Sequence, residues 1–461
     1  MAINNYITAI EIGSSRISGA VGIQTYSGIR ILAYAGEPVG GFISKGVVRN
    51  IDETSKSLTS LVNRLDDQLK DATIQSAYVA FGGLSMHSIH STVTRNFNTY
   101  TKITEETIKE MALENEALSI VPDGYCKIDV IPLECHLNGE TTTTPIGTTT
   151  LRIERNYLNI VLREQYMKQM LEAFEMAQIG IIEGVSTAKV GAPLLFEDDE
   201  TTSGTALIDI GGGTTTVTIF SNNLMKKLAI IPLGSANITK DLCSSGKVSV
   251  VEAEQMKIFK GYRSQENNTS PITTEETDRI ISARMLEILH NAKHQIETSG
   301  VEVGKVILTG GGSKLKNIEL LTEKVLSNYK VRLAKGDNWN IEVADNLELS
   351  ADAITPALLG LLLSGKENCC KEEITAPNEA TPQTDLFIKE MPTEIYEKEN
   401  EEKLEERAKE KTEEKKREEK KKKPSKTNIF FKNLFGAVED FVDNVTAEED
   451  GDNKPKNDES L

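Results

Sequence analysis

Residues 1–365 alternate between two patterns of hydrophobic and polar positions. Short runs rich in β-branched and other apolar residues lie at 6–12, 77–81, 206–210 and 305–309. Longer stretches, at 54–69, 164–177 and 279–297, repeat their apolar positions with the period of a helix. Strand-like runs that alternate with helical stretches predict an α/β fold built from layers of sheet and helix.

Three of the predicted strands run directly into turns rich in glycine, serine and threonine. The first turn follows Glu11, the second follows Asp209 and the third follows Thr309. Glycine lets the backbone approach a ligand closely, and successive turn N–H groups form a concave site for an anion. A carboxylate just before such a turn is placed where Mg²⁺ would meet phosphate oxygens. Because strand-like sequence follows the first two turns, we expect each to be the turn of a β-hairpin.

These segments resemble the actin-like ATPase family, and within it the FtsA family of bacterial cell-division proteins. Residues 11–16 resemble the first phosphate loop of the family, 209–215 its second phosphate loop, and 309–313 its adenosine loop. Residues 253–257 resemble the helix that contacts ribose and adenine, and 356–362 the closing helix. The resemblance implies two related α/β domains around a cleft that binds ATP and Mg²⁺.

The resemblance, together with the chemistry of the turns, also indicates which residues would hold the nucleotide. Glu11 and Asp209 would organise Mg²⁺, through water. Glu254 would accept a hydrogen bond from a ribose hydroxyl, and Lys257 would lie beside the nucleoside. The other expected nucleotide-binding residues offer turn N–H groups, hydroxyls or a close approach of the backbone: Gly13, Ser14, Ser15, Gly211, Gly212, Gly213, Thr214, Thr215, Gly310, Gly311, Gly312 and Ser313.

The group that would position an attacking water is missing from its usual place. In DnaK-type chaperones and in MreB the corresponding segment carries a glutamate, but here Gly184 stands at that position and Glu183 precedes it. A shift of one residue redirects a side chain substantially. Glu183 is therefore not an automatic substitute, and we assign no catalytic residue. Glu183 is a candidate for the role, and the alternative is an ordinary residue at the start of a helix. We expect an ATPase that is slow or depends on assembly, with a mainly structural role.

Residues 84–165 resemble the inserted subdomain that distinguishes FtsA, although pilus-assembly relatives share a similar insertion. This segment has no strand-end glycine turn, so we expect a separate module on the surface of the first lobe that takes part in filament contacts. The expected boundaries are 1–83 and 166–198 for the first lobe, 84–165 for the insertion, 199–235 and 301–365 for the second lobe core, 236–300 for its outer subdomain, 366–427 for a charged linker, 428–446 for an amphipathic helix, and 447–461 for an acidic tail.

Composition changes after residue 365. Three prolines punctuate a polar stretch, and 397–423 consists almost wholly of Glu, Lys and Arg. Such a segment buries too little apolar surface to offset its ordering entropy, so it predicts a disordered linker or a solvated charged helix. The net charge of the 461 residues is −18, which disfavours broad binding to nucleic acid.

Beyond the linker, 428–446 forms an amphipathic pattern with an apolar face rich in phenylalanine. Lysines at 420–423 precede it, as expected of a helix that lies on an anionic membrane surface. The alternative is a helix that docks in a protein groove, and the acidic residues at 448–450 would repel anionic lipid. The residues expected to face the membrane are Phe430, Phe431, Leu434, Phe435, Val438, Phe441 and Val442.

The resemblance to FtsA implies a cell-division protein that polymerises and tethers FtsZ filaments to the membrane at the septum. The implied partners are the C-terminal peptide of FtsZ, further copies of the chain, the anionic membrane surface and later division proteins. No apolar run approaches the roughly 18 residues of a membrane span, and no signal-like segment begins the chain, so we expect a peripheral protein on the cytoplasmic face. The alternatives are a pilus-assembly actin-like protein and a sugar or acetate kinase of the same fold.

Overall fold

The computed structural model describes residues 5–372 apart from positions 27, 70, 119, 198, 263–272, 337–338, 346 and 350–352. The amphipathic helix expected at 428–446, the acidic tail and most of the expected linker lie outside the described residues. The expected membrane-facing residues lie there too. Within the described ranges, no helix is long and apolar enough to cross a bilayer.

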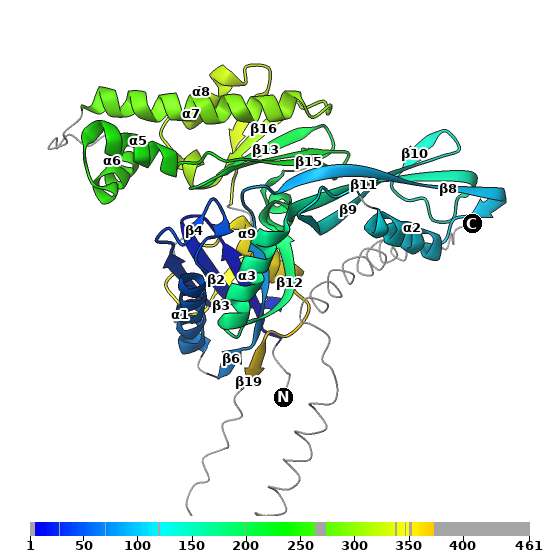
Figure 1. The fold of residues 1–461 in the computed structure, drawn as a ribbon, viewed down its shortest axis with the longest axis horizontal. Helices are drawn as coiled ribbons and strands as arrows, with labels where there is room; N and C mark the ends of the chain where they lie inside the picture. Colours follow the sequence, from blue (N-terminus) through cyan, green and yellow to red (C-terminus); the bar gives the residue numbers. More distant parts are fainter. Residues whose placement is uncertain are drawn as a thin grey trace, which may run out of the picture. The chain divides into compact units, whose positions relative to one another are not determined.

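Two large sheets form the framework of the described chain (Figure 1). The six-stranded sheet has the order β12-β7-β1-β2-β3-β18, and the nine-stranded sheet has the order β10-β9-β11-β8-β15-β14-β13-β16-β17. The strands of the first sheet are β1 (Ile7–Ile12), β2 (Arg16–Thr25), β3 (Gly28–Pro38), β7 (Ser76–Phe81), β12 (Gly180–Ser186) and β18 (Ile341–Val343). Those of the second are β8 (His87–Lys102), β9 (Tyr125–Leu137), β10 (Glu140–Thr142), β11 (Thr149–Arg163), β13 (Thr205–Ile210), β14 (Thr215–Ser221), β15 (Leu224–Ile231), β16 (Lys305–Thr309) and β17 (Lys330–Leu333).

Helices cover the six-stranded sheet because their apolar faces are buried against its apolar side chains. Helix α1 (Ile51–Leu69) buries Leu58, Leu61 and Leu65, which share one helical face. Gly19 of β2 lies under this face, where a Cβ would come within 2.9 Å of a Leu65 methyl carbon. The other helices of this part are α3 (Glu164–Met176), α4 (Thr187–Gly191), the 3-10 helix η1 (Ala192–Leu195) and α9 (Pro356–Ser364).

A second hydrophobic core lies between the nine-stranded sheet and its helices. Helix α7 (Thr274–Glu297) contributes Met285, Ile288 and Leu289, which pack with Ile208 and Val306 of the sheet. The α/β layers predicted from the sequence are therefore confirmed. The remaining helices of this part are α5 (Ala236–Gly246), α6 (Val250–Tyr262), the 3-10 helix η2 (Gly311–Lys314) and α8 (Ile318–Val325).

The segment expected as an insertion consists of β8, β9, β10 and β11 with α2 (Glu105–Ala117). It has a core of its own, in which Ile103, Met111, Ile153 and Tyr157 are almost completely buried. Buried polar groups add a second layer of contacts, since the Asn159 amide donates to the hydroxyl of Ser91 at 2.8 Å. These contacts make the segment a compact unit.

The placement of this unit differs from the expectation of a module that lies on the first lobe. Strand β8 pairs with β15 at His87 and Ala229 and so extends the sheet of the second lobe. The hydroxyl of Ser88 also accepts a hydrogen bond from the backbone N–H of Leu228 at 2.9 Å. The free edge of β15 supplies N–H and C=O groups that need partners, and β8 provides them. Contact with the first lobe exists as well, through an ion pair of 2.7 Å between Asp129 and Lys189.

The start of the expected linker at 366 is also corrected. Strand β19 (Cys370–Glu372) pairs antiparallel with β6 (Ala72–Ile74), and the N–H of Cys369 donates to the carbonyl of Tyr6 at 2.8 Å. The side chains of Cys369 and Cys370 are buried. Two adjacent cysteines supply apolar surface for this contact, and β19 therefore lies within the expected linker. A second small sheet joins β4 (Ile43–Ser44) to β5 (Val47–Val48).

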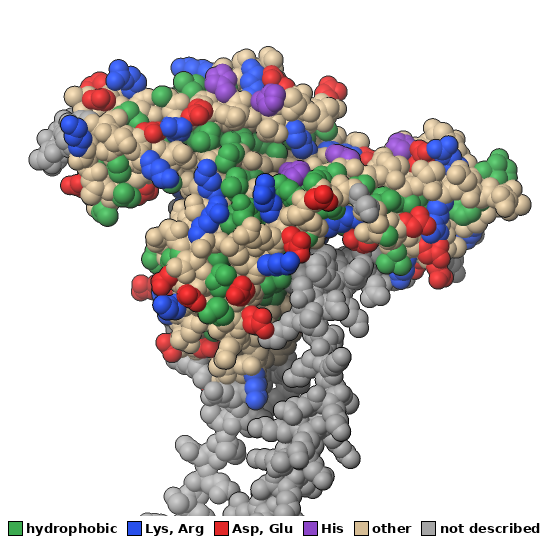
Figure 2. Space-filling model, in the orientation of Figure 1, with side chains coloured by type: hydrophobic (Ala, Val, Ile, Leu, Met, Phe, Trp, Pro, Cys, Tyr) green, Lys and Arg blue, Asp and Glu red, His purple; other side chains and the backbone are tan. Residues whose placement is uncertain are grey.

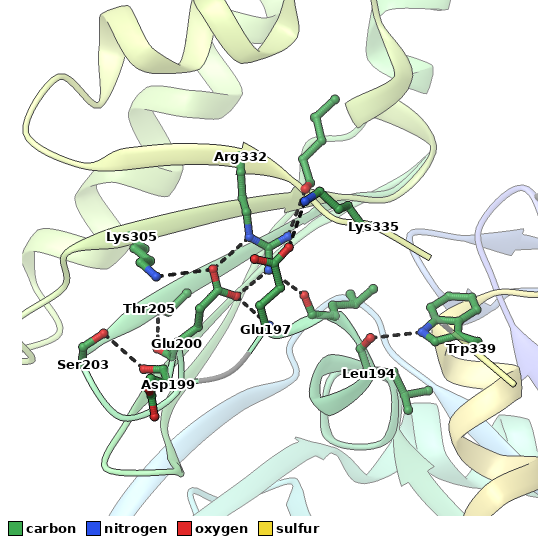
Figure 3. Close-up of polar contacts among 12 residues, drawn as sticks. Leu194, Glu197, Asp199, Glu200, Ser203, Thr205, Lys305, Arg332, Lys335 and Trp339 are labelled. Carbon is green, nitrogen blue, oxygen red and sulfur yellow. Dashed lines mark hydrogen bonds and ion pairs between the residues drawn. The ribbon is translucent and has the colours of Figure 1, made fainter. Parts of the chain in front are cut away.

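The chain passes between the large sheets several times, and a polar cluster ties together two of these connections, 187–204 and 334–340 (Figure 3). Arg332, at the end of β17, donates from Nε to Glu200 Oε1 at 2.9 Å and from Nη2 to the Leu195 carbonyl at 2.9 Å. The indole N–H of Trp339 donates to the Leu194 carbonyl at 3.1 Å. The contacts of Arg332 join β17 to the connection 187–204, and the contact of Trp339 joins the two connections directly.

The carboxylate of Glu200 is the buried centre of this cluster. Burial would raise its pKa, but the hydrogen bonds and charge of Arg332 hold the pKa below its usual value. The backbone N–H of Glu197 also donates to it at 2.8 Å, and Lys305 lies at 3.6 Å. The carboxylate is thus stable as an anion only while its partners remain.

We therefore expect Arg332→Met to lower the free energy of unfolding by about 2 to 3 kcal/mol, because a buried carboxylate would lose its main partner. Chemical denaturation of the two proteins measures the difference. The matched control is Lys335→Met, whose ammonium group pairs at 3.1 Å with the exposed Glu197. An exposed pair of this kind contributes about 0 to 1 kcal/mol. Equal losses in the two variants would contradict a buried role for Arg332.

Candidate functional site

A pocket of about 320 Å³ lies where the ends of β1 and β13 meet. Its walls come from both large sheets and from the starts of α4 and α9. Both expected hairpins are present, because β1 pairs antiparallel with β2 and β13 with β14. Of the residues expected to bind a nucleotide or Mg²⁺, the pocket lining includes Glu11, Gly13, Ser14, Ser15, Asp209, Gly211, Gly212, Thr214, Gly310 and Gly311.

Two carboxylates from different sheets face this pocket. Burial raises the pKa of Glu11 to about 7, against the hydrogen bond from Thr355 that lowers it, and the charge of Asp209 adds to the rise. Burial likewise raises the pKa of Asp209 to about 6. Asp209 packs against the third turn, where a Cβ on Gly310 would come within 2.2 Å of its Oδ1 and the glycine has φ of 85°. Two partly buried carboxyl groups with raised pKa values favour a cation in the pocket that they share.

The turns of the two hairpins offer backbone donors to the same space. The N–H groups of Gly13 and Gly211 close their own turns, on the carbonyls of Arg16 and Thr214. No hydrogen bond within the described ranges engages the N–H groups of Ser14, Ser15, Gly212 or Gly213. Such a pair of turns forms a concave site for an anion such as a phosphate.

Close contact between these turns explains their glycines. A Cβ on Gly212 would lie 2.0 Å from the hydroxyl oxygen of Ser15, and a Cβ on Gly213 would lie 2.8 Å from the Cβ of Ser14. A larger residue at position 213 would push the turns apart, whereas one at position 212 would force the Ser15 hydroxyl to rotate away. Gly213 therefore serves the contact between the turns, although it is not among the residues that line the pocket.

The residues present fit a nucleotide with Mg²⁺. Mg²⁺ is usually held in proteins by one or two carboxylates, with phosphate oxygens and waters as its other ligands. Glu11 and Asp209 supply two carboxylates, and among the described residues no group of three or more acidic, His or Cys side chains could hold a metal alone. Arg16 lines the pocket, but its guanidinium donates to the hydroxyl of Tyr34. Phosphate charge would therefore be balanced by the cation and the turn N–H groups.

Several expected residues lie outside the pocket lining. The hydroxyl of Thr215 donates to the Leu233 carbonyl at 2.9 Å, and the hydroxyl of Ser313 donates to the Gly310 carbonyl at 2.8 Å. Gly312 packs on Ile210, where a Cβ would lie 2.3 Å from the side chain. These three residues shape their turns.

Glu254 and Lys257 on α6 pair with each other at 2.7 Å. Glu254 also accepts from the Thr239 hydroxyl at 2.5 Å, and neither residue of the pair lines the pocket.

Glu183 does not stand at the start of a helix. It lies within strand β12, next to an irregularity in the pairing with β7, and α4 begins only at Thr187. The expectation of a residue at the start of a helix was therefore wrong. The strand and the helix follow each other directly, and a short apolar run cannot separate the two by periodicity alone. Glu183 is not among the residues that line the pocket.

Sequence reasoning missed Thr355, which lines the pocket and bonds to Glu11. The available signal was a threonine followed by proline before an apolar run, which is typical of a helix start. Gly82 and Gly83, which follow β7 and also line the pocket, were missed as a further glycine turn after a strand.

The raised pKa values predict opposite pH dependences for stability and for Mg-ATP affinity. Because the pKa values in the folded protein exceed the ordinary values of 4.5 and 3.8, the free energy of unfolding without ligand should fall as pH rises. The fall should span about pH 4 to 7 and amount to about 1 to 2 kcal/mol per carboxylate, less than the full shifts because both groups line the pocket and are only partly buried. Mg-ATP affinity should rise over the same range, because a cation needs ionised carboxylates.

Chemical denaturation and calorimetry at a series of pH values measure the two curves. Glu11→Gln should flatten the upper part of both curves, because only that carboxyl titrates near pH 7. An affinity that does not change between about pH 5.5 and 7.5 would contradict the assignment of these carboxylates to the cation.

Comparison with known proteins agrees with this geometry. A family model described as Cell division protein FtsA matches residues 206–354. The Cell division protein FtsA of Porphyromonas gingivalis is 29% identical over 436 residues, which cover 87% of this chain and 89% of that protein. The Cell division protein FtsA of Bacillus subtilis is 28% identical and covers 72% of this chain and 79% of its own length.

Among solved structures, a chain of the PilM-PilN type IV pilus biogenesis complex matches with a TM-score of 0.56. The match covers 77% of this chain and 96% of that one at 16% identity, so it bears on the fold alone. Together with the two sheets and their hairpin turns, it confirms the actin-like ATPase fold that was expected from the sequence.

Proposed function

Because this chain belongs to the FtsA family of cell division proteins, we propose that it binds ATP with Mg²⁺, polymerises, and tethers FtsZ filaments to the cytoplasmic face of the cell membrane at the division site. Its role is mainly structural. Its partners are the C-terminal peptide of FtsZ, further copies of the chain, anionic lipid and later division proteins.

The observation that carries the proposal is the pocket between the ends of β1 and β13. Glu11 comes from one sheet and Asp209 from the other, and the free turn N–H groups come from both hairpins. A ligand that contacts both sheets stabilises the arrangement in which both can reach it. The main role of ATP in this proposal is therefore to stabilise one arrangement of the two lobes, and its hydrolysis is secondary. Slow hydrolysis is part of the proposal, because Gly184 stands at the position where DnaK-type chaperones and MreB carry the water-positioning glutamate.

Polymerisation is assigned to the inserted unit. It has its own core and contributes none of the residues that line the nucleotide pocket. Tyr100, Leu113 and Leu151 are exposed on it, with exposed fractions of 70%, 55% and 41%. A repeated contact between unlike surfaces of identical chains gives a filament when it does not close. These exposed apolar side chains lie on a unit that takes no part in the pocket, so they are available for such a contact.

Membrane attachment is assigned to the amphipathic pattern at 428–446. On the face shown in Figure 2, Lys and Arg side chains are interspersed with Asp and Glu, so that face of the folded part offers anionic lipid no broad basic surface. The sequence pattern of the tail combines an apolar face with preceding lysines. A single helix of this kind binds weakly, but a row of tails on one filament binds by avidity.

The interaction with FtsZ is tested by capture on an immobilised peptide that carries the C-terminal sequence of FtsZ. We expect full-length protein to bind this peptide and not a scrambled peptide of the same composition. The main alternative is a pilus-assembly role. Its basis is the similarity in fold to a chain of the PilM-PilN complex. Failure to bind the peptide at micromolar concentrations would contradict the division role and favour that alternative.

A further inference from the structure

The hydroxyl of Thr355 has two partners that fix its direction. Thr355 precedes α9, and its Oγ1 accepts a hydrogen bond from the backbone N–H of Leu358 at 3.2 Å. The same oxygen donates to Oε2 of Glu11. Because the Leu358 N–H occupies the acceptor side of this hydroxyl, its single proton is directed at Glu11. One carboxylate oxygen of Glu11 is thereby engaged, and the other oxygen remains for the pocket.

Helix α9 holds this hydroxyl in a fixed place. Leu358, Leu359 and Leu361 are almost completely buried. The helix also lies against α4, where a Cβ on Gly360 would come within 2.2 Å of the Val190 carbonyl oxygen. With Pro356 in its first turn, α9 begins at a defined residue. Thr355 therefore cannot follow Glu11 if that side chain moves.

The two carboxylates of the pocket differ in how they are held. Asp209 is short and packs against the turn at Gly310. Glu11 has one more rotatable bond and loses more conformational freedom when it is fixed. The hydrogen bond from Thr355 is the contact that can compensate for this difference.

We propose that Thr355 is a positioning residue for Glu11, which it holds in the orientation that a hydrated Mg²⁺ at the nucleotide needs. This inference rests on the proposed function, since it requires that Mg-ATP binds in the pocket. In this proposal Thr355 acts on the cation through Glu11 and is not itself a ligand of the cation. Its effect is confined to the dependence of nucleotide binding on Mg²⁺.

The test titrates Mg²⁺ into full-length protein that holds a fixed concentration of a fluorescent ATP analogue. We expect Thr355→Val to raise the Mg²⁺ concentration at half-saturation about tenfold, as the loss of one hydrogen bond to a charged group implies. Thr355→Ser keeps the hydroxyl and should stay within about twofold of the unmodified protein. Affinity for the analogue in EDTA should be the same in all three proteins.

A role limited to capping the helix would give a different result. Thr355→Val would then lower the melting temperature without moving the Mg²⁺ half-saturation, which would overturn the inference. Thr355→Gly retains most capping ability and still lacks the hydroxyl, so it tests the point if the valine variant folds poorly. Thr273→Val is the matched control, because Thr273 caps α7 by accepting from the Glu276 N–H at 3.1 Å. It should leave the half-saturation unchanged.

A double-mutant cycle with Glu11→Asp gives the sharpest discrimination. Aspartate at position 11 is too short to keep the contact with Thr355, so Thr355→Val in that background should change the half-saturation by less than about twofold. An equal effect of Thr355→Val in both backgrounds would overturn the inference while leaving the proposed function intact. If the unmodified protein binds no nucleotide at all, the inference and the proposed function fall together.

Discussion

Replacement of Asp209 by alanine should abolish measurable binding of Mg-ATP. Asp209 is one of two carboxylates in the pocket, and without it a cation would keep only Glu11 as a protein anchor. The triphosphate charge would then be balanced mainly by the turn N–H groups. Loss of the cation clamp corresponds to at least about a hundredfold loss in affinity, or roughly 3 kcal/mol. Isothermal calorimetry with Mg-ATP measures this directly.

The same substitution should not weaken the fold. Asp209 is buried with a raised pKa, so its ionised form costs stability at neutral pH, and the variant without ligand should unfold at the same or higher denaturant concentration. Asp241→Ala serves as the control, since it removes a carboxylate that pairs with Arg284 away from the pocket. The control should bind Mg-ATP normally. Unchanged affinity in Asp209→Ala would remove the basis of the site assignment.

Deletion of 428–461 should abolish co-sedimentation with anionic vesicles while Mg-ATP binding remains. The deleted segment holds the amphipathic pattern, and the described part that forms the nucleotide pocket ends well before it. Phe431→Glu and Phe435→Glu should have nearly the same effect, because each places a charge on the apolar face of the helix. Vesicle sedimentation with full-length and truncated protein gives the comparison.

A control variant separates the effect of an added charge from the effect of its position on the helix. Asn433→Glu adds the same charge on the polar side of the helical pattern and should retain most of the binding. Full sedimentation of the truncated protein would show that the tail is not the anchor. A helix that docks in a protein groove would then become the better interpretation of the pattern.

The pocket could be predicted from the sequence because its main parts are local. Each hairpin turn follows its strand directly, and the carboxylate stands within two residues of the first glycine of its turn. Neighbouring positions in the sequence therefore already show that each carboxylate lies beside the N–H groups of the turn that follows it. Only the meeting of the two turns, Ser15 against Gly212, required the fold.

Contacts between distant parts of the chain could not be predicted in this way. Arg332 and Glu200 are 132 positions apart, and Thr355 and Glu11 are 344 apart. No periodicity or turn signal relates such pairs. The pairing of β8 with β15 was missed for the same reason, since an unpaired strand edge accepts any strand that the fold brings to it.

Local ambiguity accounts for the errors at Glu183 and at the linker. The run 180–191 passes from strand to helix without a polar turn, so its pattern fits either element. The linker boundary was set by overall composition, which hid the two apolar cysteines before β19 ends. A window of a few residues would have shown that two apolar residues, Cys369 and Cys370, follow the polar run 364–368.

The central claim is that the chain attaches FtsZ to a membrane, and recruitment of FtsZ to anionic vesicles tests it most directly. Purified FtsZ is sedimented with vesicles and Mg-ATP in the presence of the full-length chain or of the chain that lacks 428–461. We predict that FtsZ enters the vesicle pellet only with the full-length chain. FtsZ that stays in the supernatant while the full-length chain itself sediments would contradict the account.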